Sequence, residues 1–221
     1  MSKVFPKWIN TLPLKIVIFA GVVGGTVTAG ITYYFTPKYT RVGYEPVQPV
    51  PFSHALHAGQ LGMDCRYCHV GVEKSAHSTI PASQTCMNCH TPGMMPVNTN
   101  NPRLAPVQVS FESGVPVPWV KVHQNPDYVY FNHAVHVNRG VSCVECHGKV
   151  NEMEVVRHEK PLSMAFCLEC HRDPAGRIRD PRDVFNLDSQ TLVAQGRLEE
   201  AHKFIKDWNV IPPQSCSGCH R

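Results

Sequence analysis

Residues 14–35 form the longest apolar run in the chain, and only Lys15 within it is charged. An α-helix rises about 1.5 Å per residue, so a run of this length can cross a hydrocarbon layer of roughly 30 Å. The pattern predicts one transmembrane helix over residues 14–35, preceded by a short cytoplasmic segment, residues 1–13. Three tyrosines suit the membrane interface, where aromatic side chains gather: Tyr33, Tyr34 and Tyr39.

A cleaved signal peptide is the alternative interpretation of this run, because Val27-Thr28-Ala29 is a passable cleavage site. The run is longer than the apolar region of an ordinary signal peptide, which favours a retained anchor. Gly21 and Gly25 form a G-x-x-x-G pair that would let a second helix approach closely. A lone anchor with incidental glycines is the simpler alternative.

The remainder of the chain shows little helical or strand periodicity. Apolar residues recur at intervals of three and four between Asp188 and Trp208, which predicts an amphipathic helix with Asp188 as its N-cap. Residues 91–130 contain seven prolines and four asparagines, which is typical of extended or looping chain. We therefore expect a mainly irregular soluble part with short helices.

The soluble part contains an internal repeat. Residues 52–90 align with residues 131–171, the proline-rich residues 91–130 link the two copies, and residues 172–221 follow the second copy. Each copy opens with a phenylalanine followed by two histidines three residues apart. These units run from Phe52 through His54 to His57, and from Phe131 through His133 to His136.

All ten cysteines fall in C-x-x-C-H motifs, so none is left over. In such a motif two thiols one helical turn apart reach the two vinyl groups of one porphyrin, and the histidine that follows binds the iron as its proximal ligand. The five motifs therefore predict five covalently bound c-type haems. In chain order, motifs 1 to 5 are Cys65-Arg66-Tyr67-Cys68-His69, Cys86-Met87-Asn88-Cys89-His90, Cys143-Val144-Glu145-Cys146-His147, Cys167-Leu168-Glu169-Cys170-His171 and Cys216-Ser217-Gly218-Cys219-His220.

Zinc and disulfide chemistry are the alternative uses of paired cysteines. A zinc ribbon needs four ligands for each metal and no histidine directly after every second cysteine. Disulfides, or redox-active C-x-x-C pairs, would leave the five motif histidines without a role. Haem attachment is the interpretation that uses every residue of the motif.

Eight histidines lie outside the motifs and are candidates for the distal position on each iron. A helical i, i+3 pair projects from one side of a turn, so its two rings can reach different irons. We expect six of the eight to be distal ligands: His54, His57, His77, His133, His136 and His158. Three residues are weaker candidates: His123, His202 and Met164, a methionine three residues before motif 4.

Full axial ligation would leave no iron open to a substrate, so we expect electron transfer and no catalytic site in this chain. The sequence also lacks the G-x-S-x-G, H-E-x-x-H and glycine-rich phosphate-loop motifs of common enzyme classes. The formal net charge of +4 omits the haem propionates, which bring the loaded protein near neutrality. Nucleic acid is therefore not an expected partner.

The histidine units followed by C-x-x-C-H resemble those of the small multihaem cytochromes of the c3 and c7 type. In those proteins the first histidine serves the nearest haem and the second a later one. Five motifs behind one N-terminal helix, with Pro118-Trp119-Val120-Lys121-Val122-His123 leading to Tyr128-Val129-Tyr130-Phe131-Asn132-His133, resemble the pentahaem subunit of alternative complex III. The resemblance covers nearly the whole chain and implies a class III-like fold built around five haems.

The resemblance also implies a relay role in a membrane respiratory complex. Electrons from quinol oxidised elsewhere would pass along the haems to a cytochrome c or a terminal oxidase. Iron–sulfur, monohaem cytochrome c and integral membrane subunits are the implied partners. Haem c is attached outside the bacterial cytoplasmic membrane, so we expect a single-pass inner-membrane protein with its haem domain in the periplasm and its N-terminus in the cytoplasm.

A membrane quinol dehydrogenase of the NapC and NrfH kind is the alternative function. Such proteins also have one N-terminal helix and several C-x-x-C-H motifs, but they bind quinol beside a haem themselves. The count of five motifs and the duplicated histidine pairs favour the relay.

Overall fold

The computed structural model describes residues 6–93 and 101–220, and the side chains of residues 36–40 lie outside the description. Parts of three expected features therefore fall outside the described residues: the start of the N-terminal segment, a stretch of the linker, and the side chain of Tyr39. The chain divides into two units, Met1–Val42 and Gly43–Arg221. Each unit is considered by itself.

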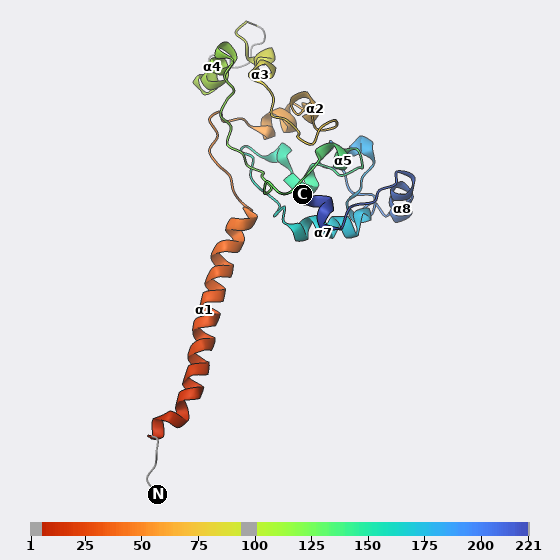
Figure 1. The fold of residues 1–221 in the computed structure, drawn as a ribbon. Helices are drawn as coiled ribbons and strands as arrows, with labels where there is room; N and C mark the ends of the chain where they lie inside the picture. Colours follow the sequence, from red (N-terminus) through yellow and green to blue (C-terminus); the bar gives the residue numbers. More distant parts are fainter. Residues whose placement is uncertain (1–5, 94–100, 221) are drawn as a thin grey trace. The chain divides into compact units, whose positions relative to one another are not determined.

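The first unit is a single long helix, α1, which runs over Leu12–Thr40 after a short 3₁₀ turn, η1, at Lys7–Thr11 (Figure 1). An 18-residue window within Lys7–Phe35 has a mean hydropathy of 1.9 and none of it is buried, so the helix is long and apolar enough to cross a membrane by length and composition. Apolar side chains exposed on all sides suit a helix surrounded by lipid. The expected helix over residues 14–35 lies within this element.

The second unit is built of short helices joined by irregular chain. Pairing between extended segments is limited, among the described residues, to two isolated bridges, Val129 with His220 and Val141 with Ile178. This agrees with the mainly irregular fold expected from the sequence. The helices in chain order are η2 Ala55–Gln60 (a π-helix), α2 Cys65–Cys68, α3 Ser83–His90, η3 Pro102–Leu104, α4 Ala105–Ser113, α5 His133–Val137, α6 Val144–His147, η4 Val150–Glu152, α7 Met164–Arg172, η5 Pro174–Arg177, η6 Pro181–Asp183, α8 Leu198–Asp207 and α9 Cys216–Cys219.

The apolar core of this unit is divided into three small clusters of three or four buried residues each. One cluster joins α3 to α4 through Met87 and Val107, and another joins α8 to η5 through Ala201 and Ala175. Hydrophobic burial is the main force that opposes chain entropy on folding, so such small clusters give the unit little stability of their own.

The predicted helix near the C-terminus is shorter than expected. We expected Asp188 as its N-cap, but α8 begins at Leu198. The Asp188 carboxylate instead accepts a hydrogen bond from the Lys149 ammonium at 2.7 Å, and the chain turns at Gly196, where φ is +73°. The apolar spacing remains correct within α8, because Ala201 is fully buried among its cluster neighbours.

A second departure is α4, which lies in the segment that we expected to be loop. Asn101 accepts a hydrogen bond from the Arg103 N–H, and Pro102 and Pro106 occupy first-turn positions of η3 and α4. Proline is compatible with the first turn of a helix, where its missing N–H would have no intrahelical partner. The prolines here therefore lie at helix starts, although we had expected this proline-rich segment to be extended or looping chain.

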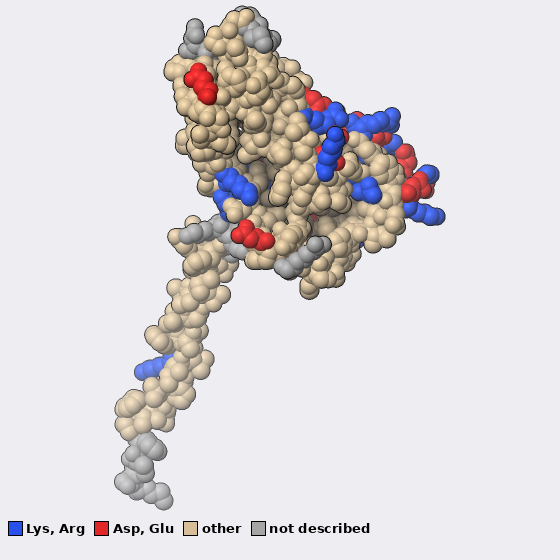
Figure 2. All heavy atoms as spheres, turned by 45° about the horizontal axis from the view of Figure 1, so that its top comes forward, with Lys and Arg blue, Asp and Glu red and all other residues tan. Residues whose placement is uncertain are grey.

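Charged side chains are unevenly distributed over the second unit. Between residues 75 and 120 only Arg103 and Glu112 are charged. Figure 2 shows the consequence: the lobe of α3 and α4 is almost free of charge, while acidic and basic side chains gather around α8. The charged segments carry most of the ion pairs of the unit, among them Arg197 with Glu200 at 2.6 Å.

At Gly140, just after α5, the backbone lies very close to the backbone of Arg179. Its φ is +80°, and a Cβ built on it would lie 2.4 Å from the Arg179 carbonyl oxygen. We expect Gly140→Ala to destabilise the protein by about 3 kcal/mol, since left-handed strain and a backbone clash add together. Gly196→Ala is the matched control, because its φ is +73° with nothing within 4 Å. That control should cost only about 1 kcal/mol, measured by denaturant unfolding, and equal costs would contradict the clash.

Candidate haem sites

The five C-x-x-C-H motifs lie on or at the start of short helices, which places both thiols of a motif on one side of a turn. The turn closes with a hydrogen bond from the histidine N–H to the carbonyl of the first cysteine. Its length is 2.9 Å in motif 1, 2.8 Å in motif 3 and 2.9 Å in motif 5. All ten cysteines are free thiols, so the disulfide alternative has no support in the structure.

Four of the five motif histidines face a second histidine ring. In each case the second ring comes from the Phe-x-His-x-x-His unit of the same repeat. The pairs and the distances between their ring centroids are His54–His69 at 6.5 Å, His57–His90 at 6.3 Å, His133–His147 at 6.3 Å and His136–His171 at 6.1 Å.

These separations fit one metal ion between each pair of rings. A metal–imidazole bond of about 2.0 Å on each side, with about 1.2 Å from ring nitrogen to ring centre, sets the centroids about 6.4 Å apart. Direct stacking of two rings without a metal would bring the centroids within contact distance, as in the 4.4 Å stack of Phe52 on His57. The four pairs could therefore each hold one haem iron.

The two histidine units are alike in three dimensions as well as in sequence. Phe52 stacks on His57 at 4.4 Å, and Phe131 stacks on His136 at 4.5 Å. The same phenylalanines meet the first histidine of each unit edge-on, both at 4.8 Å. Phe52 and Phe131 therefore orient both rings of their units, a role that the sequence signalled only by their fixed spacing.

Five of the paired rings have their Nδ1 atom bound to a backbone carbonyl. A ring N–H that donates at Nδ1 leaves the Nε2 lone pair free to bind a metal and fixes the orientation of the ring. This arrangement is the one that iron ligation requires. The bonds run from His57 to Ser53, His69 to Thr79, His133 to Ala76, His136 to Asn132 and His171 to Pro213, with lengths of 2.7 to 2.8 Å.

Burial keeps several of these imidazoles neutral. Burial, and then the neighbouring His69, lowers the pKa of His54 to about 4. Burial and the surrounding histidines lower the pKa of His147 to about 3, and burial also lowers the pKa of His136. A protonated imidazole cannot bind a metal, so a low pKa favours the ligating form at neutral pH.

The remaining predicted distal residues lie elsewhere. His77 is exposed, and the carbonyl of its neighbour Ala76 accepts the hydrogen bond from His133. His158 is only 2% exposed and stacks on His123 at 5.0 Å, while His123 contacts His147 of motif 3 at 4.3 Å. The structure thus brings His158 and His123 together beside motif 3, although the sequence ranked His123 as a weaker candidate.

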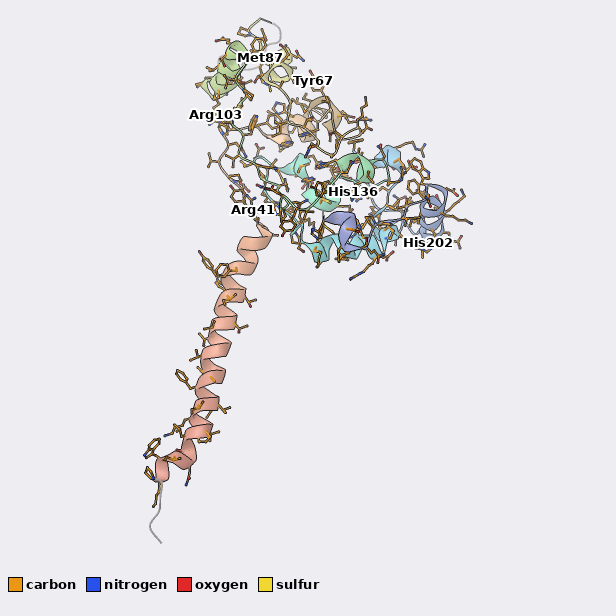
Figure 3. The ribbon with its side chains drawn as sticks, in the orientation of Figure 1. Arg41, Tyr67, Met87, Arg103, His136 and His202 are labelled. Atoms are coloured by element: carbon orange, nitrogen blue, oxygen red, sulfur yellow. The ribbon has the colours of Figure 1, made fainter. Side chains whose placement is uncertain are left out.

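The two other weak candidates lie at the surface. His202 is exposed on α8, at the edge of the unit, whereas His136 lies among packed side chains (Figure 3). Met164 is exposed at the first position of α7. No motif histidine ring of the described residues faces either side chain, so neither is singled out as a ligand.

Motif 5 is held by the segment that precedes the second repeat. Val129 bridges to His220, the Tyr130 N–H donates to the Cys219 carbonyl at 2.9 Å, and the ring of Tyr128 meets that of His220 at 5.5 Å. This is a different environment from the four facing pairs. None of the four facing histidine pairs includes His220, so they identify no distal ligand for motif 5.

The thiols show which motifs are neighbours in space. Burial first, and then nearby thiols of another motif, raises the pKa of several cysteines, to about 12 for Cys146 and about 11 for Cys143. These electrostatic interactions between thiols of different motifs link the motifs in the order 2–1–3–4–5. The neighbours are Cys86 and Cys89 to Cys68, Cys65 to Cys143, Cys167 and Cys170 to Cys146, and Cys219 to Cys167.

Comparison with known proteins adds three relatives and one family. Residues 108–208 match the family described as cytochrome c552. The chain is 31% identical over 179 residues to the multihaem cytochrome c subunit of menaquinone reductase from Nitratidesulfovibrio vulgaris, covering 79% of this chain and 77% of that one.

Two further relatives are longer proteins of which this chain covers less than half. Cytochrome c-552 of Maridesulfovibrio salexigens is 24% identical over 228 residues, covering 82% of this chain and 45% of its own length. Cytochrome c-552 of Bacteroides fragilis is 32% identical over 84 residues, covering 35% of this chain and 17% of its own length.

Proposed function

The chain belongs to the multihaem cytochrome c family that includes the menaquinone reductase subunit, and on this premise we propose that it is an electron-relay subunit of a quinone-linked membrane complex. Membership implies covalent haem c, and the count of five haems is part of the proposal. The observation that carries it is the set of four facing histidine pairs, spaced at 6.1 to 6.5 Å. The chain would move electrons and transform no substrate.

The proposed ligands follow the geometry of the sites. The ten motif cysteines attach the five haems, and His69, His90, His147, His171 and His220 are the proximal ligands. His54 and His57 serve the haems of motifs 1 and 2, and His133 and His136 serve those of motifs 3 and 4. When bound, each haem supplies a reversible one-electron couple at its iron. His77 and His158 remain predicted distal ligands from the sequence, without a facing motif histidine in support.

The ring pairs favour a relay over a catalyst. An iron with an imidazole on each side has no vacant position for oxygen or nitrite. The histidine rings here are held by backbone carbonyls, so displacing one would break a hydrogen bond as well as a metal bond. These residues therefore favour electron transfer through closed sites.

The proposed path of the electrons is linear. Neighbouring thiols support the order motif 2, 1, 3, 4, 5, with the α3–α4 lobe at one end and the C-terminal motif at the other. Repeat 1 would thus hand electrons to repeat 2 through motifs 1 and 3, which lie side by side in the middle. Electrons could enter at either end.

The direction of flow has two candidates. The resemblance to the pentahaem subunit of alternative complex III supports flow from quinol to a cytochrome c or a terminal oxidase. The relative from Nitratidesulfovibrio vulgaris is named a subunit of a menaquinone reductase, which favours flow toward the quinone. The resemblance supports integral membrane, iron–sulfur and monohaem cytochrome c subunits, or a terminal oxidase, as partners, and the relative supports a quinone reductase complex as the setting.

We propose that α1 anchors the chain in the inner membrane. Its apolar stretch, Lys7–Phe35, is long enough to span the bilayer. Haem c attachment outside the cytoplasm supports a periplasmic second unit and a cytoplasmic N-terminus. Washing membranes at high salt and alkaline pH tests the anchor, since a spanning helix should keep the protein in the pellet.

The test of the proposed function is the haem content and spin state of the purified full-length protein. We expect five haems per chain and electron paramagnetic resonance signals that are low-spin at motifs 1 to 4. The angle between the two imidazole planes shapes such signals. It is 2° and 9° at motifs 1 and 3 but 57° at motif 2, so motif 2 should give a distinct low-spin signal.

Two outcomes would overturn the proposal. Fewer than five haems per chain would remove at least one motif from the relay. A high-spin signal from any of motifs 1 to 4 would show an open iron and would support the NapC and NrfH kind of function, in which the chain binds quinol itself.

A further inference from the structure

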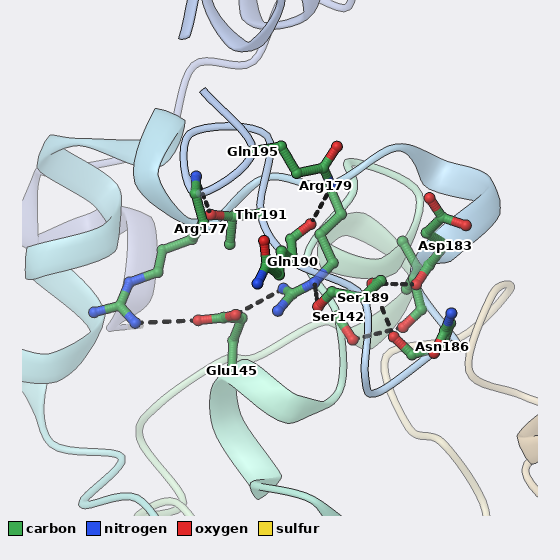
Figure 4. Close-up of polar contacts among 12 residues, drawn as sticks. Ser142, Glu145, Arg177, Arg179, Asp183, Asn186, Ser189, Gln190, Thr191 and Gln195 are labelled. Carbon is green, nitrogen blue, oxygen red and sulfur yellow. Dashed lines mark hydrogen bonds and ion pairs between the residues drawn. The ribbon is translucent and has the colours of Figure 1, made fainter. Parts of the chain in front are cut away.

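An ion-pair network connects motif 3 to motif 4, and Figure 4 shows its centre, where Glu145 lies between Arg177 and Arg179. Arg177 donates to the Glu145 carboxylate at 3.1 Å and to the Glu169 carboxylate at 2.9 Å. The second Glu145 oxygen accepts from Arg179 at 2.6 Å. Glu145 belongs to motif 3 and Glu169 to motif 4, so Arg177 joins the two motifs directly.

The two glutamates hold the same place in their motifs. Each is the residue directly before the second cysteine, in Cys143-Val144-Glu145-Cys146 and in Cys167-Leu168-Glu169-Cys170. The other three motifs carry a tyrosine, an asparagine and a glycine at this place: Tyr67, Asn88 and Gly218. The acidic residue is therefore a feature of the two motifs that Arg177 connects, and it is not required for haem attachment itself.

The network is most buried at its centre. The side chains of Arg179 and Glu145 are 6% and 13% exposed, whereas those of Arg177 and Glu169 are 38% and 68% exposed. Arg179 also donates to the Ser189 carbonyl at 3.1 Å, so it is fixed on a second side. Glu145 thus keeps Arg179 as a buried partner when Arg177 is altered. The structure around Glu145 therefore does not depend on Arg177 alone.

We propose that Arg177 is a positioning residue for electron transfer between the haem sites of motifs 3 and 4. It holds α6 and α7 together through the equivalent glutamates, and it places a positive charge beside both sites. In this step one electron passes from one iron to the other, and no proton or co-reactant takes part. The inference rests on the proposed function.

The charge of Arg177 also affects the haem sites of motifs 3 and 4 electrostatically. Cys146 of motif 3 and Cys170 of motif 4 are neighbours, and the Arg177 charge acts on Cys170. A positive charge beside a haem stabilises the reduced form relative to the oxidised form and so raises the reduction potential. Arg177 would raise the potentials of both sites together, which keeps them matched for electron exchange.

Two variants of the haem-loaded full-length protein separate charge from geometry. Arg177→Gln removes both the charge and the forked guanidinium group. Arg177→Lys keeps the charge but lacks the rigid guanidinium that binds two carboxylates. Arg197→Gln is the matched control, since Arg197 forms an exposed pair with Glu200 and touches no motif. Redox titration followed by electron paramagnetic resonance gives the potentials, and transient absorption after photoreduction gives the rate of internal electron equilibration.

We expect Arg177→Gln to lower the potentials of the motif 3 and motif 4 haems by about 59 mV, a tenfold change in the one-electron equilibrium, and to slow equilibration. Arg177→Lys should keep the potentials and still slow equilibration. Arg197→Gln should change neither. If Arg177→Gln fails to load haem, Glu169→Gln replaces it, because it weakens only the exposed end of the bridge. This variant removes a negative charge, so it should raise the potential of the motif 4 haem and still slow equilibration.

The outcomes distinguish this inference from the proposed function. Wild-type potentials in Arg177→Gln would overturn the electrostatic part, and a wild-type rate in Arg177→Lys would overturn the positioning part. Either result, with five haems present and those of motifs 1 to 4 low-spin, leaves the relay function standing. Loss of the relay function itself would already appear in the unmodified protein as a low haem count or an open iron.

Discussion

The second unit, Gly43–Arg221, is expected to be unfolded when haem is not attached. Its three apolar clusters contain three or four buried residues each, too few to offset the chain entropy of a unit this size. Its motif cysteines and histidines would then lack the porphyrins around which we propose that they pack. Cofactor binding would therefore supply most of the folding free energy, as metal binding does in small zinc domains.

Expression in cells that cannot attach haem c tests this expectation, with the same chain from haem-attaching cells as the control. Far-ultraviolet circular dichroism should show loss of the short helices while the signal of α1 persists in detergent. Limited proteolysis should remove the second unit within the time that leaves the loaded protein intact. A protease-resistant second unit without haem would show that the polypeptide folds by its own contacts.

Replacement of His133 by alanine is expected to convert one haem in five to the high-spin state. The ring of His133 faces that of His147 at 6.3 Å with an angle of 9° between the planes, whereas the ring of His123 meets that of His147 edge-on at 4.3 Å, which is too close for an iron between the two rings. Its Nδ1 atom donates to the Ala76 carbonyl at 2.8 Å, so the ring is held for ligation. Loss of the ring opens the sixth position at motif 3.

The matched control is His202→Ala, which removes the same side chain from an exposed position on α8. Electron paramagnetic resonance and the visible spectrum of the oxidised proteins should show a high-spin signal beyond that of the unmodified protein only in His133→Ala. Added imidazole should restore the low-spin state in that variant. An unchanged low-spin spectrum in His133→Ala would remove this residue from the proposed ligand set.

The general architecture of the chain could be predicted from its sequence because two signals in it are strong. A long uncharged apolar run predicts a helix such as α1 whatever its neighbours do. The C-x-x-C-H motif fixes local geometry through bonds within five residues, and the i, i+3 spacing of the histidines fixes how they diverge. For this reason the mainly irregular second unit follows from local pattern, whereas the facing of particular histidine rings, such as His57 with His90, does not.

The details that were missed depend on contacts between distant segments. Asp188 has the chemistry of an N-cap, but an ion pair with Lys149, 39 positions away, determines where it lies. The helix α4 forms in a proline-rich stretch because its prolines happen to occupy first-turn positions and because Val107 packs on Met87. The contact of His123 with His147 could not be read from spacing, since nothing local connects the two residues.

The repeats also have a consequence for how such proteins can arise. In all four facing pairs, both rings belong to the same repeat, and the copies are joined by hydrogen bonds such as those from His133 to Ala76, from Ala134 to Ser75 and from Ala55 to Met153. A duplicated gene segment would therefore deliver two complete haem sites at once, with every ligand already in register. Descent with tandem duplication could lengthen the chain of haems in steps of two, and a lineage would need to evolve only the joint between neighbouring copies.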